Sequence, residues 1–274
     1  MATDTCKLTG AKGRFVKSHL IPKALTRPEA PGLPLIQRGS GRRQKIRWDS
    51  WYDSKLVTRQ GEDILSDLDD WAIRYLRDQK LIWSGWGPMT VLGSYHTPIP
   101  GTPWGLRKIK VDDPDRLRLF FLSLLWRAAA SELPEFSEVV MPAVDLDQLR
   151  KMLVSQSLEP ISFYPIVLTQ LSTMGIIHNM TPLAQVKHIP ELAGPQDEPT
   201  ARDIPIFRFY FYGLVAHVHR HAVDDGYSKK LGDFFVGAAG ELTVTTVTYQ
   251  HSFEHENLSY VMAETIFDPN DRYR

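Results

Sequence analysis

The chain has 274 residues, of which 43% are hydrophobic and 23% charged, an ordinary composition for a soluble globular protein with a sizeable core. It contains no run of about 18 apolar residues that could cross a membrane and no apolar segment near the N-terminus typical of a secretory signal, so we expect a cytoplasmic protein. Its single cysteine excludes an internal disulfide and any zinc site built from several cysteines.

Charge is unevenly distributed along a chain whose net charge is zero. Residues 1–60 hold 13 Lys and Arg against 4 Asp and Glu, whereas residues 61–274 hold 19 against 28. A basic lobe on an acidic body is typical of a protein that contacts nucleic acid through that lobe. Equally, the basic segment could pair with the acidic surface of the same chain or of a partner protein.

The first 60 residues predict a turn, a short strand and a long loop. The strand runs from Phe15 to His19, and Pro22 prevents a helix from following it. Residues 26–47 are rich in proline, glycine and arginine, which predicts a loop. The next residues include aromatic side chains that either stack on nucleic-acid bases or anchor the loop to the core: Trp48, Trp51 and Tyr52.

Three helices are predicted from apolar spacing. The first spans residues 62–78, with acidic side chains in its first turn and arginines in its last, as the helix dipole favours. Asp113 followed by Pro114 predicts a second helix start, and Asp145 a third. Residues 82–109, rich in Gly, Pro and Trp, are predicted to be an irregular linker.

Strand-like patterns dominate the remainder, at residues 161–168, 173–178, 204–218 and 242–249. Helices followed by strands predict an α+β fold. We expect an N-terminal ββα module over residues 1–80, then a body over residues 81–274 in which helices precede antiparallel strands.

Two histidine groups have metal-like spacing. On a strand, His217, His219 and His221 would share one face and could bind zinc; the alternative is a solvated strand end. His251 and His255 would share a helix face, but the Thr, Val and Tyr residues before them argue against a helix there.

The sequence Ser18-His19-Leu20-Ile21-Pro22-Lys23 resembles the His-Ile-Ile-Pro core of bacterial HNH endonuclease-like proteins, which have a ββα-metal fold. In that family two Cys-x-x-Cys pairs bind a structural zinc, one before the histidine and one before the helix. The corresponding positions here are Cys6 with Thr9 and Thr58 with Gly61. Three of the four ligands are absent, so we expect no structural zinc.

The resemblance covers residues 6–78, and residues 119–130 are similar to the helix that follows the HNH part in such relatives. It implies that His19 is a general base and that Glu62 opens the helix carrying the metal-binding group. Glu62 and Asp63 would then bind Mg²⁺. The family's usual Asp before the histidine is Ser18 here, and its usual Asn at the helix start is Glu62.

Both catalytic residues also have a structural interpretation. His19 could cap the turn before Pro22, and Glu62 could stabilise the helix N-terminus electrostatically. For nucleic-acid contact, the expected residues are basic side chains of the N-terminal lobe: Lys17, Lys23, Arg38, Arg42, Arg43, Lys45 and Arg47.

Three functions follow from these observations. The first is an HNH-like protein that binds DNA or RNA through residues 1–60, has lost cleavage, and serves bacterial defence against phage or mobile elements. The second is an active Mg²⁺-dependent nuclease with His19 as its base. The third is a non-enzymatic adaptor whose basic loop binds a partner protein, for example within a defence complex.

Overall fold

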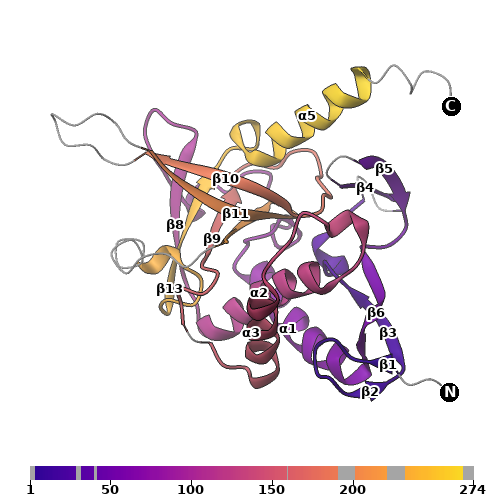
Figure 1. Ribbon diagram of the computed structural model, residues 1–274. Helices are drawn as coiled ribbons and strands as arrows, with labels where there is room; N and C mark the ends of the chain where they lie inside the picture. The colour runs from indigo at the N-terminus through magenta and orange to yellow at the C-terminus, as the bar shows by residue number, and fades with distance from the viewer. Residues whose placement is uncertain are drawn as a thin grey trace.

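The protein is described by a computed structural model that covers residues 4–28, 32–39, 42–158, 160–190, 201–220 and 232–267. The fold is α+β, as predicted (Figure 1). Its N-terminal elements are β1 (Asp4–Thr5), β2 (Lys12–Gly13), β3 (Phe15–His19), β4 (Leu35–Gly39), β5 (Arg42–Arg47), β6 (Tyr52–Thr58) and α1 (Arg59–Asp78). Within the described chain, no helix is long and apolar enough to span a membrane.

The elements of the body are, in order, β7 (Thr97–Pro98), β8 (Trp104–Lys110), α2 (Pro114–Ala130), α3 (Ala143–Ser155), β9 (Ile166–Leu171), β10 (Leu183–Pro190), β11 (Ala201–Phe211), β12 (Leu214–His219), β13 (Glu241–Val247) and α5 (Phe253–Phe267). Their strands form one seven-stranded sheet in the order β10-β11-β12-β9-β13-β8-β7. All its pairs are antiparallel except β13 with β9, which is parallel. The sheet is therefore mixed, which corrects the expectation of antiparallel strands.

Three helices cover one face of this sheet and α5 lies over the other (Figure 1). The central helix α2 begins where predicted: the Asp113 carboxylate accepts a hydrogen bond from the backbone N–H of Arg116 at 2.9 Å, and Pro114 occupies the first turn. Every residue of α2 from Leu117 to Ala128 is buried, because α1 and α3 flank the helix and the sheet covers it.

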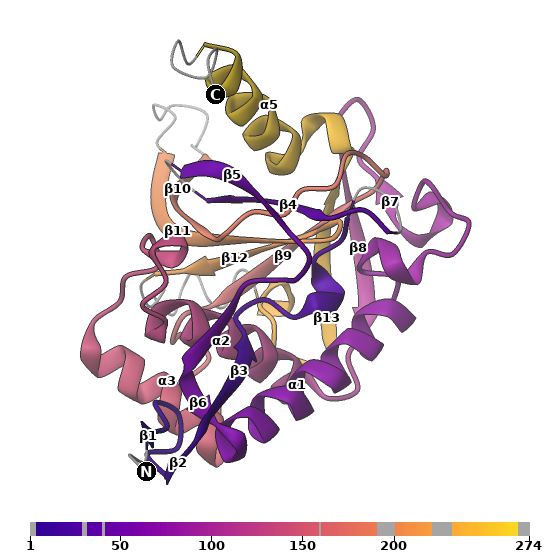
Figure 2. The same cartoon turned by 90° about the vertical axis from the view of Figure 1, so that its right-hand side faces the viewer.

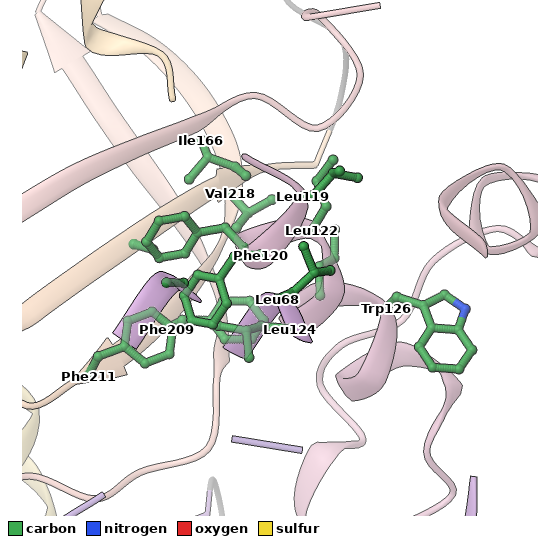
Figure 3. Packing of buried hydrophobic residues seen from close by; sticks show 14 of the residues in the cluster. Leu68, Leu119, Phe120, Leu122, Leu124, Trp126, Ile166, Phe209, Phe211 and Val218 are labelled. Carbon is green, nitrogen blue, oxygen red and sulfur yellow. The ribbon is translucent and has the colours of Figure 1, made fainter. Parts of the chain in front are cut away.

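The core lies between α2 and the sheet. Figure 3 shows Phe120 and Leu124 of α2 packed with Leu68 of α1 and with Phe209 and Phe211 of β11. The same continuous cluster extends from Cys6 to Val244. The segments predicted as module and body thus share one hydrophobic core.

Two predicted irregular regions contain strands. The segment 26–47 includes β4 and β5, which pair as an antiparallel hairpin, so the prediction of a loop throughout is wrong. Its proline and glycine content masked the pairing of Leu35 with Arg47 and Ile36 with Ile46. The predicted linker 82–109 contributes β7 and β8 to the sheet, and β8 alternates exposed and buried residues as an edge-side strand should.

The long apolar run 204–218 is two strands rather than one. β11 and β12 form a hairpin that turns at Gly213, whose φ of +86° is readily adopted only by glycine. The predicted strand at 161–168 begins only at Ile166, because the carbonyls of Pro160 and Phe163 accept hydrogen bonds from Arg118 of α2 instead of from a strand. Residues 173–178 form no strand, whereas β13 confirms the strand predicted at 242–249.

The first and last helices also differ from expectation. α1 begins at Arg59 rather than at residue 62, directly after β6. The expectation that no helix follows the Thr/Val/Tyr run is wrong, because α5 begins at Phe253. His251 lies in the short 3₁₀ turn before it, and His255 lies in its first turn.

Candidate functional site

Strands β3 and β6 pair ahead of α1, and the hairpin of β4 and β5 lies between them in the chain. β3 and β6 are antiparallel, with Ser18 opposite Asp53 and His19 opposite Tyr52. Both strands run alongside the N-terminal half of α1 (Figure 2). This arrangement places His19 at the end of one strand and Glu62 in the first turn of the helix that follows the other.

The His19 imidazole is held by Asp49, a residue that the sequence did not single out. His19 Nε2 lies 3.1 Å from Asp49 Oδ1, and the imidazole is partly exposed. Asp49 is fixed in turn, because the Ser50 backbone N–H donates to its carboxylate at 2.9 Å and Gln37 donates to its backbone carbonyl at 2.7 Å. A histidine paired with a fixed carboxylate has the arrangement of a base with an orienting acid.

Three basic groups share the Asp49 carboxylate. Lys17 donates a short hydrogen bond to it, Lys23 lies 3.8 Å away, and His19 is the third. Partial burial disfavours the charged carboxylate, but the hydrogen bonds from Lys17 and His19 outweigh it and lower the pKa of Asp49 to about 2. Asp49 therefore stays ionised at any physiological pH.

Ser18 and Glu62 form the opposite side of the site. Ser18 is fully buried, and its hydroxyl lies near the Glu62 carboxylate without a well-formed hydrogen bond. Glu62 Oε2 is also buried and has no hydrogen-bond partner. Burial, with a smaller contribution from Asp69, raises the pKa of Glu62 despite the nearby Arg127. Glu62 thus lies beside Ser18, the position where the family that the sequence resembles usually has an Asp.

Arg127 of α2 lies beneath this site and was missed from the sequence. Its side chain is buried and donates to the His19 carbonyl at 2.9 Å and to both carboxylate oxygens of Asp69 at 2.9 and 2.5 Å. Arg127 also donates a hydrogen bond to the Ser123 hydroxyl at 2.8 Å. An arginine inside the apolar run 119–130 was the available signal, since a buried guanidinium requires partners.

The predicted metal pair is not brought together. Asp63 is largely exposed and lies 3.8 Å from Arg59, away from the half-buried Glu62, because adjacent helix positions point in different directions. Asp67 pairs with Arg116 at 2.6 Å. Among the described residues, no three His, Cys, Asp or Glu side chains are grouped to hold a metal ion.

The four positions that correspond to zinc ligands do converge. The turn at Cys6 is closed by hydrogen bonds from the Gly10 N–H to the Cys6 carbonyl at 2.9 Å and from the Thr9 N–H to its sulfur at 3.4 Å. Burial disfavours the thiolate, but hydrogen bonds from Thr9 and the Thr58 backbone outweigh it and lower the pKa of Cys6. A Cβ placed on Gly61 would lie 2.7 Å from that sulfur. With one thiol among four positions, these side chains do not fit a closed zinc site.

The close approach of Gly61 to Cys6 predicts the effect of a single methyl group. Gly61→Ala should lower the free energy of unfolding by at least about 1 kcal/mol, because the new Cβ meets buried sulfur and Val57. Urea unfolding would measure the change, and Gly87→Ala, which meets no atom within 4 Å but has a φ of +59°, gives the cost of backbone strain alone for comparison.

The basic side chains predicted to bind nucleic acid lie in different surroundings. Lys17 and Lys23 lie at Asp49, Arg47 is exposed, and Lys45 pairs with Glu135 of the body at 2.6 Å. Arg38, Arg42 and Arg43 lie in β4 and β5, but their side chains are outside the described residues. Part of the basic lobe is therefore neutralised by the acidic body, as one interpretation of the charge pattern expected.

A cleft of about 780 Å³ opens beside the site, between the segment 46–55 and the segment 132–135. The three aromatic residues predicted either to stack on bases or to anchor the loop differ in exposure. Trp51 is buried and meets Phe136 edge-on at 6.1 Å, whereas Trp48 is 72% exposed and Tyr52 is 44% exposed. Lys17 lies 4.1 Å from the centre of the Tyr52 ring.

The other histidine groups form no metal site in the described structure. His217 and His219 share one face of β12, but both are buried, so the alternative of a solvated strand end is wrong. His217 accepts a hydrogen bond from Arg208 at 3.1 Å, and burial together with the cations around it holds its pKa well below the usual range. His221 lies outside the described residues. His251 bonds Thr248, whereas His255 packs on Tyr249.

Comparison of this chain with protein-family models, with curated proteins and with solved structures finds no match.

Proposed function

We propose that residues 1–80 form an HNH-like module that binds nucleic acid and no longer cleaves it. One observation carries the proposal: β3, β6 and α1 bring His19, Ser18 and Glu62 together and gather the four zinc-ligand positions around Cys6, the arrangement that the short motif implies. The exposed side chains around His19 are basic and aromatic, which suits contact with phosphates and bases.

Loss of cleavage is supported by the buried surroundings of Glu62. The buried guanidinium of Arg127 lies close enough to Glu62 to influence its charge. Arg127 is itself paired with Asp69, and burial raises the pKa of Glu62, which favours the neutral carboxyl over the ionised form that a divalent cation requires. Ser18 supplies a hydroxyl where the family has a carboxylate.

By the same resemblance, we propose a role in bacterial defence against phage or mobile elements.

The binding proposal is tested by the salt dependence of affinity for DNA and RNA. Replacing Lys17 and Arg47 together with glutamine should weaken binding and reduce the slope of log affinity against log salt by up to about 1.8, since each lost phosphate contact removes about 0.7–0.9. Lys108→Gln with Lys110→Gln removes the same charge from β8 and should leave the slope unchanged. Absence of binding to either nucleic acid at low salt would exclude the proposal and favour the adaptor function.

A second function, Mg²⁺-dependent cleavage, is favoured by the pairing of His19 with Asp49. In this second function His19 would accept a proton from water, and Glu62 would supply one carboxylate ligand to Mg²⁺. Water and substrate phosphate commonly complete the coordination of Mg²⁺. The bound ion would stabilise the leaving oxygen.

His19→Ala separates the two functions. If the chain cleaves DNA or RNA with Mg²⁺ or Mn²⁺, this variant should lose at least about 100-fold in rate, because proton transfer is removed. The fold should persist, since the His19 carbonyl that binds Arg127 is retained. A cleavage rate unaffected by the substitution would remove His19 from the mechanism, and no cleavage by the unmodified chain would support a binding role alone.

A further inference from the structure

The most exposed tryptophan of the described chain lies at the edge of the cleft. Trp48 follows β5 and is 72% exposed, while Trp51, three residues later, is 6% exposed and packed against Phe136. Trp48 makes no hydrogen bond or ring contact within the described structure. Ile46, which is 70% exposed, lines the same cleft, and exposed apolar side chains that lie together commonly mark binding surfaces.

Cations lie next to Trp48 in the chain and around Asp49, the residue that follows it. Arg47 precedes it in the chain and is exposed. Beyond it, Asp49 is shared by Lys17, Lys23 and His19, so one carboxylate meets two lysines and positive charge remains in excess. These groups provide a narrow strip of phosphate-binding charge next to an exposed aromatic face.

The opposite wall of the cleft carries ion pairs. Glu132 and Glu135 line it, and each already pairs with a lysine: Lys7 at 2.8 Å and Lys45 at 2.6 Å. Each pair is neutral overall, so this wall offers phosphate no excess positive charge. A duplex has two phosphate backbones, and the second would lie over the wall that lacks excess cations. A single strand needs cations along one side only.

We infer that this chain binds unpaired nucleotides of single-stranded DNA or RNA, with a base stacked on Trp48 and the adjacent phosphates held by Arg47 and Lys17. Stacking is available to every base, because each has a π-face, so binding tolerates differences in sequence. The inference rests on the proposed nucleic-acid function and names its substrate class. Tyr52, 44% exposed and next to Lys17, offers a second aromatic surface along the same strip.

The test compares binding of labelled dT12, rU12 and a 12-base-pair DNA duplex to the full chain at low salt, measured by fluorescence anisotropy. Affinity should be higher for at least one single strand than for the duplex. Trp48→Ala should weaken single-strand binding by at least about five-fold, the lower end of the stacking contribution of one base. Trp48→Phe should retain most of the affinity, because a phenyl ring still stacks.

Trp104→Ala is the matched control, since Trp104 is 36% exposed on β8 of the seven-stranded sheet, to which none of the N-terminal strands β1–β6 belongs. Binding that favours the duplex and does not change in Trp48→Ala would overturn this inference while leaving the proposed function intact. No binding to any of the three oligonucleotides would overturn both. Melting curves of each variant confirm that the exposed substitutions leave the fold intact.

Discussion

Arg127→Met is expected to lower the free energy of unfolding by about 3–5 kcal/mol, the cost of removing one member of a buried ion pair. The guanidinium is 1% exposed and binds both oxygens of Asp69. Without it, Asp69 stays buried as an unpaired charge, and the His19 carbonyl loses its donor. Chemical denaturation measures the loss, and amide hydrogen exchange near His19 should increase.

Two variants test the cause of this effect. Arg127→Met combined with Asp69→Leu should recover much of the stability, because the unpaired charge is then removed as well. Arg116→Met, which breaks the exposed pair with Asp67 at 2.6 Å, should cost no more than about 1 kcal/mol. Equal losses from Arg116→Met and Arg127→Met would show that burial does not set the strength of the Arg127 pair.

Glu254→Gln is expected to stabilise the protein increasingly as the pH rises. Glu254 is buried in the first turn of α5, and one of its carboxylate oxygens has no hydrogen-bond partner. Burial raises its pKa well above the ordinary value of 4.5. Between these two pKa values the Glu254 carboxyl is ionised in the unfolded chain and protonated in the folded chain, so folding takes up a proton.

The uptake of one proton by Glu254 on folding sets the sign and size of the pH effect on stability. Above about pH 4.5 the unmodified protein should lose up to about 1.4 kcal/mol of stability per pH unit through Glu254, until the pH reaches the folded pKa. Glu254→Gln removes this dependence, so its advantage should be absent at pH 4 and grow toward pH 7. Glu256→Gln, exposed two residues later on the same helix, is the control. An advantage that is the same at pH 4 and pH 7 would contradict the expected proton uptake.

The helices that depend on local signals were predictable from sequence. Asp113 and Pro114 mark the start of α2 because capping and backbone geometry act within a few residues. The strand that ends at His19 was also clear, since Pro22 limits it. Strand pairing was harder to predict: β4, β5 and β8 depend on partners elsewhere in the chain, and proline and glycine concealed them.

The surroundings of His19 depend on contacts that no local pattern encodes. Asp49 reaches His19 from 30 residues away, and Arg127 reaches it from 108 residues away. Burial was likewise undetermined, because the alternation of His217 and His219 predicts a shared face but not whether that face meets water or α5. By itself the sequence determined the charge asymmetry, the strand that ends at His19 and the single cysteine. Only the tertiary structure decided which charges meet, because long-range packing sets the distances and desolvation on which electrostatic interactions depend.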